Sequence, residues 1–322
     1  MTDRHDCVTH ISARDIPVPD HLSDAARSYL KPRPAAQPYP EIEDTTGWRA
    51  YVAAADGAVI PLLRQVRAAV NAQVIERDAA GAHVFDVLPE GVPADNRGVV
   101  LEMHGGALIL CGGDLCRGMA VGSATRLRQR VWSVDYRMPP DHPYPAALDD
   151  CIIAYRTLLS ERTPEEIIVS GGSAGGNLAA ALLLRARDEG LPMPAGLILS
   201  TPEIDLTESG DSFQTHEGLD PGLHSLMPVN LLYANGYDLA HPYLSPLYGD
   251  LSQFPPTILT SGTRDLFLSN TVRMHRKLRA SGVVAELHVV EAGPHTGFPG
   301  CPEGDEIDSE IRRFVNARLG SG

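Results

Sequence analysis

Two patterns of hydrophobic residues alternate along much of this 322-residue chain. From residue 72 onward, short apolar runs rich in β-branched residues predict strands at 72–79, 83–90, 98–105, 131–136, 165–171, 195–201, 255–262 and 285–293. Between them, apolar residues at helical spacing predict helices at 118–129, 147–160, 174–189, 267–281 and 305–318. Regular alternation of strands and helices favours an α/β fold, a mostly parallel sheet with helices on both faces.

Two regions depart from this alternation. Residues 1–75 are rich in proline and alanine and predict helices at 23–30 and 46–70, and some fifty residues separate the strand at 195–201 from the next one. Because that gap far exceeds ordinary loop length, we expect an insertion with structure of its own, including a helix within 222–236. We expect both regions to cap the carboxyl ends of the strands, where open α/β sheets bind ligands; the alternative is a surface decoration.

The predicted organisation is therefore a discontinuous core with two additions. The N-terminal cap segment is residues 1–73, the catalytic core is residues 74–205 and 250–322, and the cap insertion is residues 206–249.

Composition narrows the classes of partner. The chain has 27 basic and 41 acidic side chains, a net charge of −14, which disfavours binding to nucleic acid or to an anionic membrane surface. No apolar stretch approaches the length of a membrane span, and the N-terminus lacks the apolar core of a signal peptide. The five cysteines form no C-x-x-C pair, so we expect neither a disulfide scaffold nor a zinc site, and a cytoplasmic location.

The candidate nucleophile is Ser173. Residues 171–175 read Gly-Gly-Ser-Ala-Gly, a G-x-S-x-G match placed after a predicted strand and before a predicted helix. A nucleophile elbow needs this context, because its sharp turn leaves no room for side chains beside the serine. The following helix also offers free backbone N–H groups beside the reacting atom.

An activated serine needs a base, and His295 is the candidate. It follows the last predicted strand in a loop that holds Gly293, Pro294 and Gly297. The other histidines after the serine have simpler interpretations. His275 is interpreted as a solvated helix residue and His288 as a residue packed on one face of the sheet. Three more are interpreted as surface or cap residues: His216, His224 and His241.

The orienting acid is predicted to be Asp265, which follows the strand at 255–262. Its rival is Asp205, after the preceding strand, and Asp211 and Asp220 are further candidates. The turn at Gly105 and Gly106 is a candidate oxyanion hole together with the N–H of Ala174. His104, at the end of its strand, is interpreted as a structural hydrogen-bonding residue.

Five stretches together resemble the hormone-sensitive-lipase branch of the α/β-hydrolase esterases: HGGA, VDYRMPPDHPYPAALDD, SGGSAGG, RDLFLSN and PHTGF, in the family's order within residues 74–320. The resemblance implies an α/β-hydrolase fold with a helical cap, and a site that needs no metal or organic cofactor. It assigns Ser173 as nucleophile, Asp265 as acid and His295 as base. It assigns Gly105, Gly106 and Ala174 as the oxyanion donors.

Three positions depart from the family pattern. Ala107 replaces the last glycine of HGGG, Gly172 replaces the aspartate that usually precedes the nucleophile, and the pair Thr296-Gly297 separates His295 from Phe298 by one extra residue. Asp135, Tyr136 and Arg137 resemble the family's scaffold beneath the oxyanion loop.

The expected function is hydrolysis of short- to medium-chain carboxylic esters through an acyl-enzyme on Ser173. One alternative is a lactone hydrolase that opens cyclic esters such as monoterpene lactones, because the stretches DLTESGDSF and GTRDLFLSNTVRMHRKL resemble those of lactonases. A second is a non-catalytic small-molecule receptor. The expected partner is a small-molecule ester or lactone, and the final strand at 285–291 is a candidate edge for a homodimer.

Overall fold

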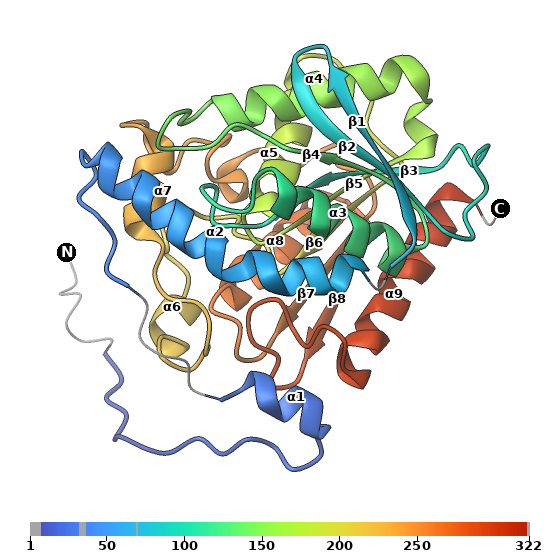
Figure 1. The fold of residues 1–322 in the computed structure, drawn as a ribbon. Helices are drawn as coiled ribbons and strands as arrows, with labels where there is room; N and C mark the ends of the chain where they lie inside the picture. Colours follow the sequence, from blue (N-terminus) through green and yellow to red (C-terminus); the bar gives the residue numbers. More distant parts are fainter. Residues whose placement is uncertain (1–7, 32–36, 69, 321–322) are drawn as a thin grey trace.

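The computed structural model describes residues 8–31, 37–68 and 70–320. At its centre lies an eight-stranded sheet with the order β1-β2-β4-β3-β5-β6-β7-β8 (Figure 1). The strands are β1 (Ala72–Ala79), β2 (Ala82–Pro89), β3 (Val99–Met103), β4 (Arg130–Val134), β5 (Ile167–Gly172), β6 (Gly196–Ser200), β7 (Thr257–Gly262) and β8 (Ala285–Val290). Only the β1–β2 and β2–β4 pairs are antiparallel, so the predicted mostly parallel sheet is confirmed.

Helices cover both faces of the sheet because its central strands are buried on both sides. Neighbouring residues of β3 belong to different cores, Val100 to one and Leu101 to the other. On the Val100 face lie α3 (Asp114–Leu127) and α9 (Pro302–Leu319). On the Leu101 face lie α4 (Ala146–Glu161), α5 (Ala174–Asp188) and α8 (Leu268–Ala280). Such fully buried strands explain the continuous apolar runs in the sequence.

The remaining elements belong to the N-terminal region and to the connections. They are α1 (Asp24–Tyr29), α2 (Thr45–Ala68), the short 3-10 helix η2 (Pro164–Glu166), α6 (Ser212–Thr215), α7 (Met227–Ala234) and the 3-10 helix η3 (Pro246–Tyr248). In Figure 1, α2 crosses in front of the sheet beside α3, and α1 lies apart from it at the lower edge.

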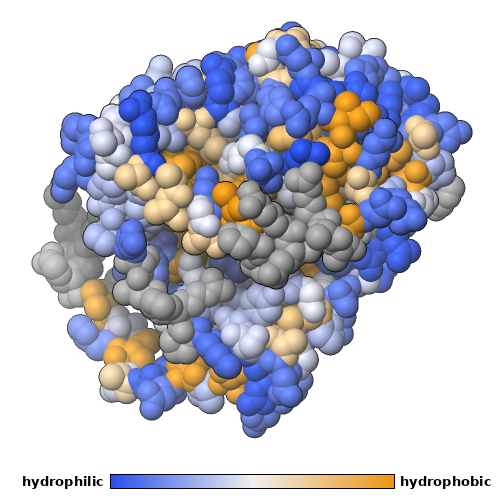
Figure 2. Space-filling view, in the orientation of Figure 1, coloured by the Kyte–Doolittle hydropathy of each residue, from blue (hydrophilic) through white to orange (hydrophobic). Residues whose placement is uncertain are grey.

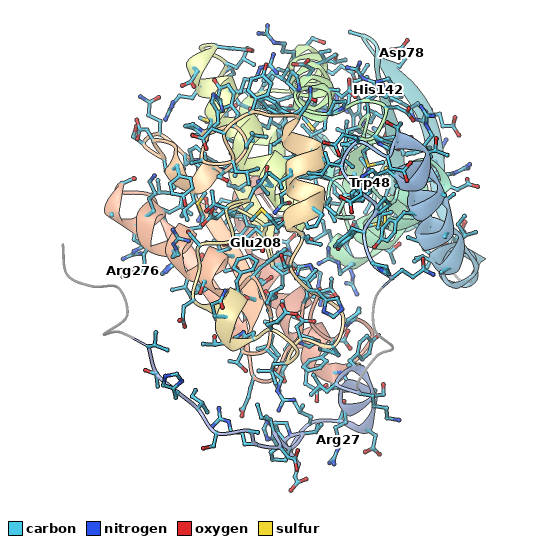
Figure 3. The ribbon with its side chains drawn as sticks, turned by 90° about the vertical axis from the view of Figure 1, so that its left-hand side faces the viewer. Arg27, Trp48, Asp78, His142, Glu208 and Arg276 are labelled. Atoms are coloured by element: carbon cyan, nitrogen blue, oxygen red, sulfur yellow. The ribbon has the colours of Figure 1, made fainter. Side chains whose placement is uncertain are left out.

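One hydrophobic cluster joins α2, the insertion and the loop after β7. It contains Trp48, Phe213, Leu226 and Phe267, all buried. Figure 3 shows Trp48 on α2 and Glu208 of the insertion on the same side of the molecule. The N-terminal region and the insertion therefore pack together at the carboxyl ends of the strands. The domain boundaries given above remain a prediction.

The surface on the α2 side is mixed in character. Figure 2 shows hydrophobic patches between hydrophilic residues rather than one continuous apolar face. Part of the exposed hydrophobic surface comes from Val8, Ile11 and Ile16 of the N-terminal segment. None of the helices that the structure describes has both the length and the apolar character needed to cross a membrane.

Candidate active site

Ser173 stands at the turn between β5 and α5 with φ +54° and ψ −126°, a backbone conformation that costs energy for a residue with a side chain. The neighbouring glycines are required by contact. A Cβ on Gly171 would lie 2.0 Å from the Gly175 carbonyl oxygen, and a Cβ on Gly175 would lie 2.0 Å from the Met103 carbonyl oxygen. The glycines therefore allow strand, turn and helix to close tightly around one serine.

Three side chains distant in the sequence meet at this turn. His295 Nε2 lies 2.9 Å from Ser173 Oγ, and His295 Nδ1 lies 3.0 Å from Asp265 Oδ1. Because a carboxylate only accepts hydrogen bonds, Nδ1 carries the ring proton and donates a hydrogen bond to Asp265. Nε2 is then free to accept the serine hydroxyl proton. The side chain of His295 is 10% exposed and that of Asp265 is fully buried.

Asp265 is held by further contacts on every side. Its Oδ2 accepts a hydrogen bond from Ser261 Oγ (2.7 Å), and its Oδ1 accepts one from the Phe267 N–H (2.9 Å). Its backbone carbonyl accepts one from Nδ1 of His216, 2.9 Å away in the insertion. The carboxylate thus has a fixed position from which to orient the imidazole.

Asp220 connects the two loops that carry Asp265 and His295. Its Oδ2 accepts hydrogen bonds from the N–H of His295 (2.7 Å) and of Leu266 (3.3 Å). Its Oδ1 accepts from the N–H groups of Gly222 and Leu223. The sequence suggested Asp220 only as one of several acid candidates. Nothing in its spacing indicated this bridging position.

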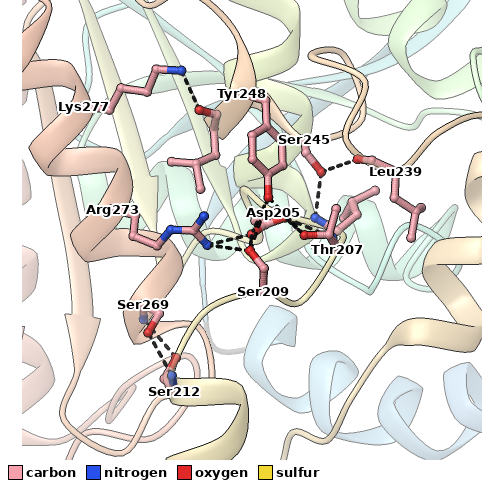
Figure 4. A network of polar contacts seen from close by, with 12 residues as sticks. Asp205, Thr207, Ser209, Ser212, Leu239, Ser245, Tyr248, Ser269, Arg273 and Lys277 are labelled. Atoms are coloured by element: carbon pink, nitrogen blue, oxygen red, sulfur yellow. Dashed lines mark hydrogen bonds and ion pairs between the residues drawn. The ribbon is translucent and has the colours of Figure 1, made fainter. Parts of the chain in front are cut away.

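Asp205, the rival acid, belongs to a separate network (Figure 4). It is fully buried and accepts hydrogen bonds from Thr207 and Ser209. It also forms an ion pair with Arg273, whose Nη1 lies 2.7 Å from Oδ2. Burial opposes ionisation, yet these contacts together hold the pKa of Asp205 below its usual value. Its partners tie the start of the insertion to α8 and include neither His295 nor Ser173.

The segment with Gly105 and Gly106 lies beside the serine turn. A Cβ placed on Gly105 would lie 3.1 Å from the Gly172 carbonyl oxygen and 3.4 Å from Ser173 Cβ, so the two segments are in contact. Gly106 has φ +128°, and a Cβ there would lie 2.3 Å from the Leu110 carbonyl oxygen. Ala174 is the first residue of α5. Within the described residues, the N–H groups of Gly105, Gly106 and Ala174 donate to no backbone carbonyl.

A buried aromatic contact supports the start of the Gly105-Gly106 loop. The rings of His104 and Tyr136 are stacked with centroids 4.1 Å apart, and the Tyr136 hydroxyl donates to the His104 carbonyl oxygen (2.7 Å). Burial lowers the pKa of His104, which keeps the ring neutral at neutral pH. This placement agrees with a structural part for His104.

One group of metal-type ligands lies nearby in the part of the chain that the structure describes. Atoms of His104, Cys116 and Asp135 come within 4.8 Å of one another. Burial raises the pKa of the Cys116 thiol well above its usual value, so it stays protonated. Asp135 already accepts from the Gly113 N–H (2.8 Å) and contacts His83 Nδ1 (3.1 Å). These contacts do not favour a metal ion, and the expectation of a metal-free site stays a prediction.

His275 and the loop after His295 have surroundings that the sequence did not predict. The interpretation of His275 as a solvated residue is wrong: its side chain is half-buried, and Nε2 lies 3.3 Å from the Ala285 carbonyl oxygen of β8. The extra residue after His295 is accommodated by positive φ angles at Thr296 (+70°) and Gly297 (+68°). Phe298 then packs against Tyr29 of α1 rather than in the cluster around Trp48.

This fold and site define a class. Residues 100–299 match the model of a family described as having the alpha/beta hydrolase fold, and the chain belongs to that family. Among curated relatives, an esterase from Acinetobacter venetianus is 34% identical over 193 residues, which are 58% of this chain and 62% of that protein. An acetyl-hydrolase from Streptomyces hygroscopicus is 32% identical over 232 residues, which are 69% of this chain and 77% of that one.

Solved structures extend the likeness over nearly the whole chain. The crystal structure of an esterase designated E25 superposes with a TM-score of 0.86 at 35% identity, over 97% of this chain and 99% of that one. An esterase from the bacterial hormone-sensitive lipase family superposes with a TM-score of 0.74 at 29% identity, over 88% and 94% of the two chains. The resemblance to the hormone-sensitive-lipase branch is therefore confirmed.

Proposed function

We propose that this chain is a serine carboxylic-ester hydrolase that acts on short- to medium-chain acyl esters. The observation that carries the proposal is the unbroken series of hydrogen bonds from Ser173 Oγ through His295 to Asp265. The relatives named as esterases and as an acetyl-hydrolase support the same reaction class.

The proposed reaction uses these three side chains in two stages. His295 Nε2 takes the proton of Ser173 Oγ as the oxygen attacks the ester carbonyl, and the Asp265 carboxylate stabilises the resulting imidazolium. The N–H groups of Gly105, Gly106 and Ala174 stabilise the oxyanion, with the amino end of α5 adding a favourable field. His295 then protonates the leaving alcohol. Water attacks the acyl-enzyme with His295 again acting as base, and the carboxylic acid is released.

The two alternatives differ in what they require of the same site. A lactone hydrolase would use the same three side chains on a cyclic ester, so only substrate tests separate it from an esterase. A receptor would require no proton transfer from Ser173. No contact within the described residues supports the receptor alternative.

Replacement of Ser173 by alanine tests the proposal. Loss of the triad nucleophile in other hydrolases costs about 10⁶-fold in kcat, so Ser173→Ala should remove measurable hydrolysis of p-nitrophenyl butyrate. Thermal unfolding of the variant serves as the control for folding. A folded Ser173→Ala protein that still hydrolyses the ester would refute the proposal. Separately, a panel of linear esters and lactones would rank the substrates of the wild type.

A further inference from the structure

A second buried carboxyl lies directly beside the nucleophile turn. Glu203 follows β6 and is 1% exposed. Its N–H donates to the Ser173 carbonyl oxygen (3.0 Å), and its own carbonyl accepts from Asn177 Nδ2 (2.8 Å). The backbone of Glu203 is thus fixed to the elbow. By contrast, no donor reaches either oxygen of its side chain at normal hydrogen-bond distance and angle within the described residues, although the Asn230 amide lies close enough to favour its charged form.

The side chain of Glu203 lies near groups from three other segments. Glu208 of the insertion and Asn230 on α7 act on its pKa, and its own charge contributes to raising the pKa of Tyr39 in the N-terminal segment. Asn230 donates through Nδ2 to the Leu206 carbonyl oxygen (3.2 Å), while its Oδ1 has no partner within the described chain. Within the described residues, Asn230 Oδ1 and the Glu203 carboxyl are thus both without a partner of normal geometry, and the two side chains are neighbours.

The charge of this carboxyl follows from its surroundings. Burial, and then the charge of Glu208, raise the pKa of Glu203 to about 8, while the Asn230 amide acts in the opposite direction. At neutral pH the group is therefore mostly a carboxylic acid, which offers one hydrogen-bond donor and also accepts. It suits a neutral polar partner better than a cation.

The residues packed near Glu203 and Asn230 are mostly apolar and aromatic, unlike these two polar side chains. Tyr39 stacks on Trp48 with centroids 5.8 Å apart, and both belong to the cluster that includes Leu226 and Phe267. The Phe267 ring in turn packs edge-on against the His295 ring, with the two centroids 4.9 Å apart. An unpaired buried polar group costs about 1–3 kcal/mol, and an apolar residue would fill this space without that cost. A bound molecule with a hydroxyl group would satisfy both side chains.

We propose that Glu203, with Asn230, is a specificity-determining residue that hydrogen-bonds a hydroxyl group of the ester substrate. The preferred substrates are then hydroxylated esters rather than simple alkyl esters of the same length. This inference rests on the proposed function, since it concerns the substrate of the same site.

Two matched pairs of substrates test the inference. Ethyl 3-hydroxybutyrate against ethyl butyrate places the hydroxyl on the acyl side, and 2-hydroxyethyl butyrate against ethyl butyrate places it on the alcohol side. The measured quantity is the ratio of kcat/KM within each pair at pH 7. We expect the wild type to favour the hydroxylated ester in at least one pair.

The variants separate hydrogen bonding from packing. Glu203→Leu should lower the favoured ratio about 10-fold, the worth of one neutral hydrogen bond, whereas Glu203→Gln keeps a donor and an acceptor and should retain most of it. Glu203→Ala serves if the leucine variant does not fold. The matched control is Glu102→Gln, which changes another buried carboxyl, next to Ser133 in the core of the sheet, and should keep the wild-type ratio.

Two results would overturn the inference: no preference in either pair for the wild type, or equal ratios for wild type and Glu203→Leu. Neither result would refute the ester hydrolase itself. That proposal fails separately, if Ser173→Ala still hydrolyses p-nitrophenyl butyrate.

Discussion

Asp265 and Glu203 occupy equivalent places after neighbouring parallel strands and yet have opposite surroundings. Each lies three residues beyond the end of its strand, β7 or β6, and each is buried, at 0% and 1% exposure. Asp265 accepts hydrogen bonds from Ser261, Phe267 and His295, while the Glu203 carboxyl accepts none from the described residues. Equal burial therefore does not imply an equal role. The partners make one carboxyl a fixed acceptor, and the absence of comparable partners among the described residues is what the proposal for Glu203 depends on.

The largest effect expected from this contrast concerns Asp265. An asparagine there keeps the shape but can no longer hold the imidazole tautomer, so Asp265→Asn should lower kcat about 10⁴-fold for p-nitrophenyl butyrate. The matched control is Asp205→Asn, which weakens the network with Arg273 and should lower stability by about 1–3 kcal/mol without a comparable loss of kcat. Equal losses of kcat in the two variants would contradict the assignment of Asp265 as the acid.

A smaller loss is expected where Asp220 connects the loops that carry Asp265 and His295. Asp220→Ala removes the acceptor of the His295 and Leu266 N–H groups, and misplaced catalytic groups cost up to about 10²-fold in rate. Steady-state kinetics should show a fall in kcat of about 10- to 100-fold, with the remaining activity still dependent on Ser173. A kcat equal to that of the wild type would show that the backbone holds these loops without Asp220.

The pH dependence of the free energy of unfolding tests the protonation state of Glu203. The folded-state pKa of about 8 lies above the ordinary value of 4.5, so between these values the folded protein binds more protons than the unfolded chain. The contribution of Glu203 to stability therefore falls as pH rises from about 4.5 to 8, by at most about 1.4 kcal/mol per unit. Glu203→Gln removes this titration.

Urea unfolding at pH 5, 6, 7 and 8 measures that difference. Relative to the wild type, the glutamine variant should gain stability steadily across the series. Parallel curves for the two proteins would mean that Glu203 carries its charge in the folded state at all these values, contrary to its surroundings.

The smallest effect concerns a glycine outside the elbow. A Cβ on Gly57 of α2 would meet no atom within 4 Å, unlike a Cβ on Gly175. Gly57→Ala should therefore stabilise the protein by about 0.5–1 kcal/mol through helix propensity, whereas Gly175→Ala should prevent normal folding. Thermal unfolding of the first variant and the soluble yield of the second check these outcomes, and a stable Gly175→Ala protein would contradict the packing described.

Local pattern was sufficient to predict most of the core. The strand predicted at 72–79 has those bounds in the structure, and the helix predicted at 174–189 ends one residue earlier at Asp188. The meeting of Ser173, His295 and Asp265 was also predictable, because their loops follow strand ends that share one edge of the sheet. Their meeting needed only the parallel topology.

The contacts made by the insertion were beyond the sequence. The bond from His216 to the Asp265 carbonyl and the two bonds to Asp220 join segments that no periodicity relates. The same is true of Glu203, whose contacts among the described residues depend on how α7 and the N-terminal segment pack near it. No pattern in the sequence distinguished this position.

Covalent labelling of Ser173 tests the central claim most directly. A fluorophosphonate should form one adduct per chain, which peptide mass spectrometry places on Ser173, and Ser173→Ala should remain unlabelled. His295→Ala should label much more slowly, because the hydroxyl then lacks its base. A folded wild-type protein that takes no label, or that is labelled only at another residue, would contradict the account.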